Sequence, residues 1–459
     1  MQVVQQHDGT EVTAIPIHFI GGLSDEQIKE KLSDVGYAQY LKEKNLLATK
    51  RYISILYANG QIDSVLFNQT EDPFDCGLLP KALPKGLYFF ADPIKDIELC
   101  YLGFMLGAYT FDKYKSERTN VEDLAKIVFI IGTPVDEIIK IYDAIALTRD
   151  LINEPTNIKT TSMLCDVAKN LAKKYNGTCQ IIEGTELEEG FPLVYAVGKA
   201  SANPPRFIVL KWGRDPKYPH INLVGKGVCF DSGGLGIKPA SSMALMKKDM
   251  GGAASVLALA KLIMSTDLKL NLTIAIPVVE NSISGNAFRP GDIYTSRSGK
   301  TVEIGHTDAE GRLILADALS FVQENSADLT IDIATLTGAA RVAMGPKVPP
   351  FFTGSDEIAR GLADASEEQH DPLWRLPLFE KYATMLKSNV ADINNISNND
   401  FAGCIIAALF LKAFVKDSNS WVHFDIYGWN LSSEPSAPVG GEAQCIRAIY
   451  SFLKKRYNC

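Results

Sequence analysis

The first part of the chain alternates between short apolar runs and charged segments, in the pattern of a small α/β domain. Two apolar runs, 51–58 and 61–68, flank Asn59-Gly60. This dipeptide accepts the positive φ of a tight turn, so the two runs predict a β-hairpin. Further apolar runs at 88–91 and 126–132 predict two more strands.

A helix is predicted over residues 135–155, where it connects this first domain to the rest of the chain. Thr133 can cap it, and Pro134 suits its first turn, where a missing N–H costs no helical hydrogen bond. One apolar stripe at helical spacing is formed by Val135, Ile138, Ile139, Tyr142 and Ile145. We therefore divide the chain into an N-terminal α/β domain at 1–134, this connecting helix, and a larger domain at 156–459.

In the larger domain, apolar runs of strand length alternate with longer helical patterns. Strands are predicted at 179–184, 192–198, 206–212, 220–227, 271–279, 328–336 and 421–428. Helices are predicted at 162–175, 251–264, 310–325 and 403–414. Continuous apolar strands interleaved with helices indicate a mixed, mostly parallel sheet flanked by helices. The fold class is therefore α/β, with a smaller domain followed by a larger one.

Composition sets the broad class of the protein. Hydrophobic residues make up 46% of the 459 residues and charged residues 22%, as in globular proteins with a full core. The net charge of -8 argues against nucleic acid as the main partner, because binding to phosphates depends on clustered Lys and Arg. The sequence predicts no membrane span, since no apolar run approaches roughly 18 residues. The eight cysteines form no CxxC pair, so we expect reduced thiols and a cytoplasmic protein.

Two segments concentrate carboxylates and lysines where apolar strands end. The first, 224–252, contains Lys226, Asp231, Lys238 and Asp249, and the second, 306–319, contains Asp308, Glu310 and Arg312. In an open α/β sheet, ligands bind beyond the carboxyl ends of the strands. Four clustered carboxylates repel one another unless cations neutralise them, and two divalent ions roughly 3.5–4 Å apart would do so while activating a bridging water. The same ions would lower the pKa of the neighbouring lysines.

Each of these residues also has a simpler interpretation. Asp308 and Glu310 could merely cap the helix that follows them, where carboxylates meet the positive end of the helix dipole. Met246 could be ordinary core. His423 and Asp425 alternate along an apolar strand, and we interpret them as hydrogen-bonded core groups rather than ligands.

Taken together, the motifs closely resemble those of the leucyl aminopeptidase family of two-zinc metallopeptidases. The resemblance rests on VGKGVCFDSGGLGIKP…MKKDM and on HTDAEGRL, where the family usually has NTDAEGRL, and it extends to RDLINEPTN, TLTGA, PLWRLPL, VADINN and WVHFDIYG. It covers roughly residues 148–430 and is weak over the first part of the chain.

The resemblance implies a role for each residue in the two segments. The implied metal ligands are Lys226, Asp231, Asp249, Asp308 and Glu310. Lys238 matches the lysine that polarises the scissile carbonyl, and Arg312 matches the arginine that holds a bicarbonate as general base. The pocket for the first side chain of the substrate would be lined by Met246, Thr335 and Gly338.

His306 departs from the family's pattern, because it replaces the usual asparagine. We favour a role as a hydrogen-bonding residue behind the metal ligands. A changed hydrogen bond near Asp308 and direct ligation are the alternatives.

The resemblance also implies the activity. We expect a metal-dependent aminopeptidase that releases the N-terminal residue, with a Leu-like preference, from short unblocked peptides through a water bridging two metal ions. The cofactors implied are Zn²⁺ or Mn²⁺, with Mg²⁺ or Co²⁺ as alternatives, and the assembly implied is a homohexamer built as a dimer of trimers. Two other hypotheses are a two-metal phosphoesterase and a binding protein that contacts DNA.

Overall fold

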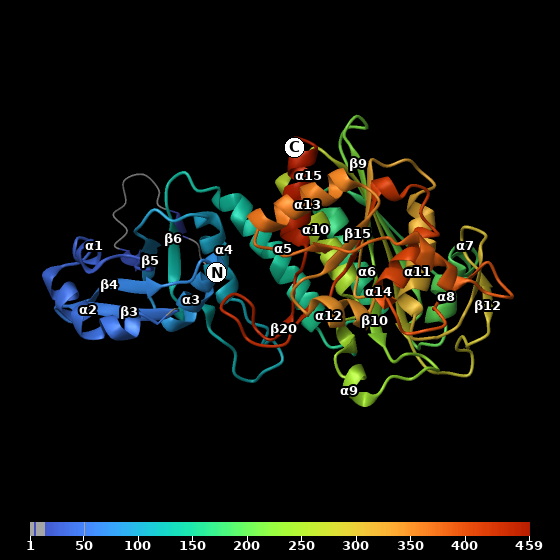
Figure 1. Ribbon diagram of the computed structural model, residues 1–459, viewed down its shortest axis with the longest axis horizontal. Helices are drawn as coiled ribbons and strands as arrows, with labels where there is room; N and C mark the ends of the chain where they lie inside the picture. The colour runs from blue at the N-terminus through green and yellow to red at the C-terminus, as the bar shows by residue number, and fades with distance from the viewer. Residues whose placement is uncertain (1–3, 6–13, 50) are drawn as a thin grey trace. The chain divides into compact units, whose positions relative to one another are not determined.

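The structure is a computed structural model that describes residues 4–5, 14–49 and 51–459 (Figure 1). The chain divides into two units, one of residues 1–146 with 432–439 and one of residues 147–431 with 440–459. The division falls inside helix α5 (Val135–Asn153), which occupies most of the segment predicted as a connecting helix. No local pattern in the sequence marks residues 432–439 as part of the smaller unit.

The smaller unit is built on a six-stranded sheet with the order β1-β6-β5-β2-β4-β3. Its strands are β1 Val4–Gln5, β2 Ile15–Phe19, β3 Tyr52–Ala58, β4 Gln61–Asn68, β5 Leu87–Phe90 and β6 Lys126–Phe129. Its helices include α1 Asp25–Lys29, α2 Asp34–Leu47, α3 Leu79–Ala82 and α4 Ile97–Gly107. The predicted hairpin is confirmed: β3 and β4 pair antiparallel, and Asn59 and Gly60 have φ of 51° and 79°.

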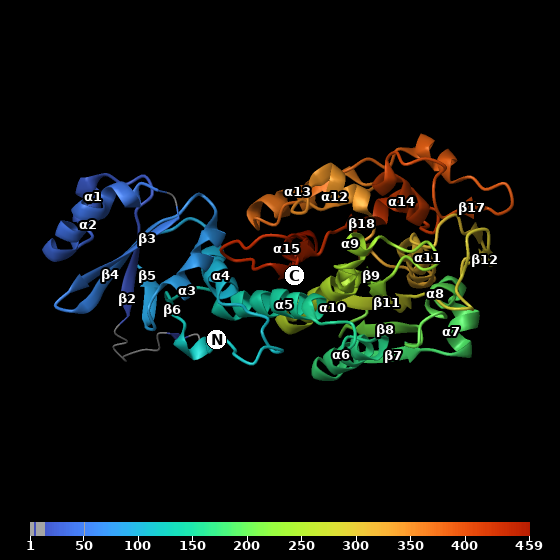
Figure 2. The same ribbon diagram turned by 90° about the horizontal axis from the view of Figure 1, so that it is seen from below.

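The larger unit is built on a mixed sheet with the order β16-β15-β18-β14-β9-β11-β8-β7, and β10 pairs with β11 (Figure 2). These strands are β7 Thr178–Ile182, β8 Arg206–Trp212, β9 His220–Gly225, β10 Gly227–Asp231, β11 Asn271–Asn281, β14 Leu329–Ala334, β15 Pro350–Thr353, β16 Trp374–Arg375 and β18 Trp421–Asp425. Strands β18, β14, β9, β11 and β10 run parallel, whereas β8, β7 and β15 are joined by antiparallel pairing. The predicted α/β class and mixed sheet are confirmed.

Helices pack around this sheet. They include α6 Thr161–Lys174, α10 Gly251–Thr266, α11 Glu310–Val322, α13 Asp356–Glu368, α14 Gly403–Lys412 and α15 Ile446–Arg456. The four helices predicted from the sequence correspond to α6, α10, α11 and α14. Among the described residues, no helix has both the length and the apolar character needed to cross a membrane.

One predicted strand is wrong. Residues 192–198 form helix α8 (Pro192–Gly198) instead. A short apolar run fits a buried strand and a buried helix equally well, so periodicity could not separate them. The helix is favoured because Pro192 begins it and because the N–H groups of Leu193 and Val194 donate to the buried carboxylate of Asp317 on α11, at 2.8 and 3.4 Å.

The parallel strands end at the same edge of the sheet, and this brings the candidate site residues to that edge. β9 ends one residue before Lys226, β10 ends at Asp231, and β14 ends one residue before Thr335. The start of α10 lies directly against β14, because a Cβ at Gly252 would lie only 2.0 Å from the carbonyl oxygen of Ile333. Only glycine at 252 permits this approach, so the helix brings Asp249 to the same sheet edge.

Replacing Asp317 with alanine should destabilise the larger unit by about 2–4 kcal/mol, because the buried N–H groups of Leu193, Val194 and Arg297 would lose their acceptor. The measurement is the free energy of unfolding in urea. Asp364→Ala, at an exposed position of α13, is the control and should change it by less than about 0.5 kcal/mol. Equal stability of the two variants would contradict this account of α8.

Candidate metal centre

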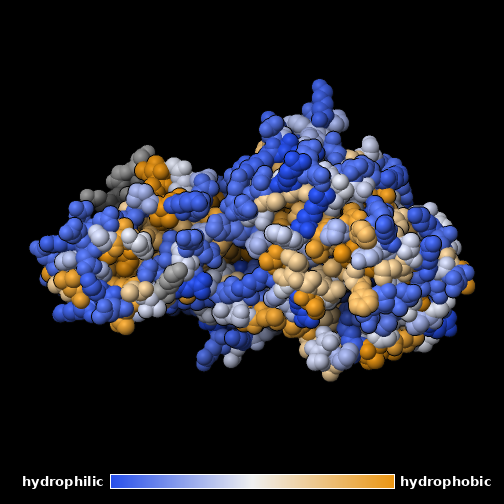
Figure 3. Space-filling view, in the orientation of Figure 1, coloured by the Kyte–Doolittle hydropathy of each residue, from blue (hydrophilic) through white to orange (hydrophobic). Residues whose placement is uncertain are grey.

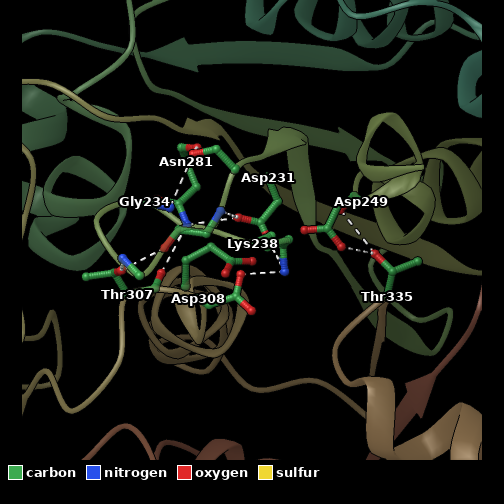
Figure 4. A network of polar contacts seen from close by, with 12 residues as sticks. Asp231, Gly234, Lys238, Asp249, Asn281, Thr307, Asp308 and Thr335 are labelled. Carbon is green, nitrogen blue, oxygen red and sulfur yellow. Dashed lines mark hydrogen bonds and ion pairs between the residues drawn. The ribbon is translucent and has the colours of Figure 1, made fainter. Parts of the chain in front are cut away.

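The acidic residues of the two sequence segments meet at the carboxyl edge of the large sheet (Figure 4). Asp231 is the last residue of β10, and Asp249 ends a short 3-10 turn, Met246–Lys248, just before α10. Asp308 and Glu310 lie at the beginning of α11. Segments far apart in the chain therefore converge on one place, as predicted for an open α/β sheet.

The distances define a tight cluster. Asp231, Asp308 and Glu310 each present a carboxylate oxygen within 4.8 Å of the other two. Asp249 joins through Lys226, whose Nζ lies 2.7 Å from Asp249 Oδ2 and 3.0 Å from Glu310 Oε1. Lys238 joins the other side, with Nζ 2.9 Å from Asp231 Oδ2 and in contact with Asp308 Oδ1.

Most of this cluster is withdrawn from water. Lys226, Asp231, Asp249 and Glu310 are buried, whereas 30% of the Asp308 side chain is exposed. The interpretation of Asp308 and Glu310 as mere helix caps is wrong, because the N-cap residue of α11 is Ala309 and it has no side-chain capping bond. The two carboxylates point instead into the cluster.

The charges of the acidic and basic side chains in the cluster do not cancel. Four carboxylates face two lysines, so the group carries an excess of negative charge. Burial, together with the charge of Asp231, raises the pKa of Glu310 to about 8. Burial lowers the pKa of Lys226, but Asp249, Glu310 and Asp231 raise it by more, and the net shift is upward. A bound cation would act on both pKa values in the opposite direction.

A divalent cation fits the residues present. Glu310 Oε2 is buried and has no hydrogen-bond partner in the part of the chain that the structure describes. An unpaired carboxylate oxygen beside two further carboxylates is the donor set that Zn²⁺, Mn²⁺ or Mg²⁺ accepts. The residues of the cluster therefore fit such an ion.

Two buried residues that the sequence analysis missed hold Asp231 in place. The side-chain amide of Asn281, at the end of β11, donates to Asp231 Oδ1 at 2.9 Å and to the carbonyl of Thr307 at 3.0 Å. Thr307 in turn donates to the carbonyl of Gly233 at 2.6 Å. A polar residue at the end of a long apolar strand was the available signal, since Asn281 lies opposite Asp231 in the register of β10 and β11.

His306 lies behind the cluster. Its Nδ1 accepts a hydrogen bond from the backbone N–H of Asp308 at 3.0 Å. Asn395, also missed from the sequence, accepts from the N–H groups of Gly305 and His306 and donates to the carbonyl of His306. Among the described residues, the cluster able to hold a metal contains no histidine. The imidazole thus orients the backbone next to Asp308.

The remaining predicted site residues surround the cluster. Arg312 is buried on α11, its guanidinium donates to the carbonyl of Asn395 at 2.7 Å, and burial lowers its pKa to about 10. The Thr335 hydroxyl donates to Asp249 Oδ1 at 2.9 Å. Met246 is half-buried in the turn before Asp249, and Gly338 is exposed at the start of α12 (Gly338–Met344).

His423 and Asp425 lie outside the cluster, as interpreted from the sequence. His423 Nδ1 is 2.5 Å from Asp332 Oδ1, and Asp425 accepts hydrogen bonds from the N–H groups of Leu336 and Thr337. Both are buried core groups that fix the ends of β18 and α12.

Comparison with known proteins gives a consistent result over most of the chain. The catalytic domain of the cytosol aminopeptidase family matches residues 146–450, and the M17 aminopeptidase N-terminal domain matches residues 33–129. A "Probable cytosol aminopeptidase" of Syntrophotalea carbinolica is 39% identical over 83% of this chain and 78% of the relative. Another from Chlamydia caviae is 44% identical over 77% of this chain and 73% of the relative.

Solved structures agree with the sequence relatives. The crystal structure of cytosol aminopeptidase from Coxiella burnetii superposes with a TM-score of 0.93 at 42% identity and covers 99% of both chains. The bottromycin maturation enzyme BotP in complex with Mn superposes with a TM-score of 0.85 at 31% identity, covering 97% of this chain and 99% of BotP.

Adding Mn²⁺ or Zn²⁺ to the metal-free protein should raise its unfolding midpoint by about 5 °C, because ions that bind only the folded cluster stabilise it. Glu310→Gln should remove most of this rise, since an amide is a weaker ligand than a carboxylate. Glu188→Gln, at an exposed position, is the matched control and should keep the full rise. Differential scanning calorimetry of each protein with and without metal measures the rise in unfolding midpoint. A full rise in Glu310→Gln would show that the ions bind elsewhere.

Proposed function

This chain belongs to the cytosol aminopeptidase family and is a metal-dependent aminopeptidase. From this premise we propose that its carboxylate cluster is the place where it removes the first residue from short peptides with a free N-terminus. The observation that carries the proposal is the convergence of Asp231, Asp308 and Glu310 within 4.8 Å beside two lysines, the buried Lys226 and the partly exposed Lys238. Two divalent ions held there would supply an activated water and a Lewis acid for the scissile carbonyl.

We propose the ligand roles that the resemblance to the leucyl aminopeptidase family implies, and the contacts of the cluster are compatible with them. Asp231 and Glu310, which each touch one of the two lysines, would be the ligands shared by both ions. Lys226 and Asp249, already paired at 2.7 Å, complete the more buried position. Asp308, which is partly exposed, serves the more accessible position. Lys226 would then bind as a neutral amine, displaced from its ion pairs by the cation.

Lys238 is the proposed electrophile of the reaction. Its ammonium lies between Asp231 and Asp308 at the more open side of the cluster, where its side chain is 14% exposed. A cationic donor at this position stabilises negative charge on the carbonyl oxygen of the substrate as the peptide bond is attacked. The positive charge is retained because the surrounding carboxylates raise the pKa of Lys238 above its ordinary value, although burial lowers it.

Arg312 is the proposed holder of the proton carrier. No histidine reaches the cluster among the described residues, so the reaction lacks an obvious general base. The buried guanidinium uses Nη1 for the carbonyl of Asn395 and can bind a bicarbonate with its other donors. That anion would accept the proton of the attacking water.

The finer properties of the enzyme follow as further proposals. Met246, Thr335 and Gly338 would line the pocket for the first side chain, and a methionine wall suits Leu-like residues. Zn²⁺ or Mn²⁺ would be the working metals, and Mg²⁺ or Co²⁺ could replace them. Because the relatives are named for the cytosol, we place this chain there too.

Self-assembly into a homohexamer, a dimer of trimers, is also proposed. Apolar side chains reach the surface of the larger unit around α12 and α14 (Figure 3). Val342 is 82% exposed and Phe401 is 77% exposed, and large apolar residues at a surface often mark contacts with another chain.

The purified enzyme should hydrolyse leucine amide, lose this activity on chelation and regain it when Mn²⁺ or Zn²⁺ is added. Lys238→Ala and Asp249→Ala should each lower kcat by about 100-fold or more while the proteins stay folded, because one loses the electrophile and the other a ligand. Release of leucine and circular dichroism are the measurements. Activity that survives complete chelation would contradict the proposal, and hydrolysis of phosphate esters in place of the amide would favour a phosphoesterase.

Bicarbonate should accelerate the wild-type enzyme in buffer freed of carbon dioxide, because it supplies the missing base. Arg312→Ala should lower kcat by about 100-fold and abolish the response to bicarbonate. Arg360→Ala, at an exposed position of α13, is the control and should respond like the wild type. If Arg312→Ala still responds, the base lies elsewhere.

A further inference from the structure

A buried lysine next to the metal centre has no partner for its charge. Lys248 is 6% exposed, and its Nζ has no hydrogen bond or ion pair with any described residue. The other buried lysines of this region are satisfied: Lys226 pairs with Asp249 and Glu310, and Lys159 donates to the carbonyl of Lys247. The side chain of Lys248 is therefore largely enclosed, and its charge is not neutralised by an ion pair with any described residue.

Among the described residues, the ammonium of Lys248 lies against an aromatic ring. Lys248 Nζ lies 4.5 Å from the centroid of Tyr427, and the guanidinium of Arg341 on α12 lies 5.2 Å from the same centroid. Arg341 also donates to the Tyr427 hydroxyl at 3.4 Å, and it has no acidic partner among the described residues. Two cations without counter-ions therefore share one tyrosine ring.

The pair of cations lies beside the proposed substrate pocket. Lys248 and Met246 belong to the same short turn, and Arg341 follows Gly338 by one turn of α12. The backbone next to Tyr427 reaches Thr335, since a Cβ at Gly428 would lie 3.2 Å from Thr335 Cγ2. The N–H groups of Tyr427 and Gly428 both donate to Gln444 Oε1, at 3.0 and 2.9 Å. These hydrogen bonds fix the backbone that carries the tyrosine ring.

The nearby carboxylates do not supply the missing acceptor. Asp249 is adjacent in sequence, but its oxygens contact Lys226 and Thr335. Asp425 also acts electrostatically on Lys248, but its oxygens accept from the N–H groups of Leu336 and Thr337 and from the Thr337 hydroxyl. Both anions are thus engaged elsewhere, so the ammonium of Lys248 is available to an acidic group of a ligand.

We propose that Lys248, with Arg341 beside it, binds an acidic side chain on the first residue of the substrate, so that the enzyme acts on peptides beginning with Glu or Asp as well as with Leu. This inference rests on the proposed function, because it assumes that Met246, Thr335 and Gly338 border the pocket. The methylene groups of a glutamate would pack on Met246, and its carboxylate would accept from Lys248. Tyr427 forms the wall that holds both cations in place.

The test compares substrates that differ only in charge. With metal-loaded wild-type enzyme, kcat/KM for glutamate α-amide should exceed that for glutamine amide by about 10-fold or more, because a charged acceptor gains most from a buried ammonium. Lys248→Met should abolish this ratio and leave hydrolysis of leucine amide within about threefold of the wild type. Lys247→Met is the matched control, because Lys247 donates to the carbonyl of Asn153 and should not affect the ratio.

Each result separates this inference from the proposed function. Hydrolysis of leucine amide with equal rates for the glutamate and glutamine amides would overturn the role of Lys248 and leave the aminopeptidase intact. Loss of metal-dependent hydrolysis of every amide would overturn the proposed function itself. If Lys248→Met does not fold, product inhibition of the wild-type enzyme tests the inference instead. Glutamate should inhibit the hydrolysis of leucine amide about 10-fold more strongly than glutamine does. Equal inhibition by the two amino acids would overturn the inference.

Discussion

Mutual repulsion among buried carboxylates is the constraint on which the structure of the larger unit depends. At a separation near 4.8 Å, two carboxylates repel each other by about 3 kcal/mol even at an effective dielectric constant of roughly 20. Lys226 and Lys238 offset part of this repulsion by bridging the acids in pairs. The remaining negative charge would favour the binding of a divalent ion at the cluster over a stable ion-pair network.

A framework that carries no charge itself holds the cluster together. Asn281 and Thr307 connect the end of β11 to the loop before α11, and Asn395 connects that loop to Arg312. Gly252 allows α10 to approach the sheet so closely that Asp249 reaches the same edge. Metal ligands need such support, because a ligand displaced by a fraction of an ångström loses much of its affinity.

Sequence patterns gave the wrong prediction where a strand and a helix fit the same residues equally well. The run at 192–198 was apolar enough for a strand, and the choice of a helix came from Asp317, more than a hundred positions away in the chain. Nothing in the local sequence distinguishes Lys248 from Lys247, which directly precedes it. Only burial separates them: one donates to a backbone carbonyl, and the other is enclosed against Tyr427.

The sequence by itself determined the α/β class and, in the larger unit, strands β7, β8, β9, β11, β14 and β18 and helices α6, α10, α11 and α14, because these depend on local periodicity. It also determined the group of acids and lysines that would meet, because their motifs are contiguous in the chain. The tertiary structure alone decided which atoms pair, which carboxylate oxygen of Glu310 stays unpaired, and which residues such as Asn281 and Asn395 support the site. Those features depend on burial and on contacts between distant segments, and a local pattern such as the polar residue at the end of β11 does not specify them.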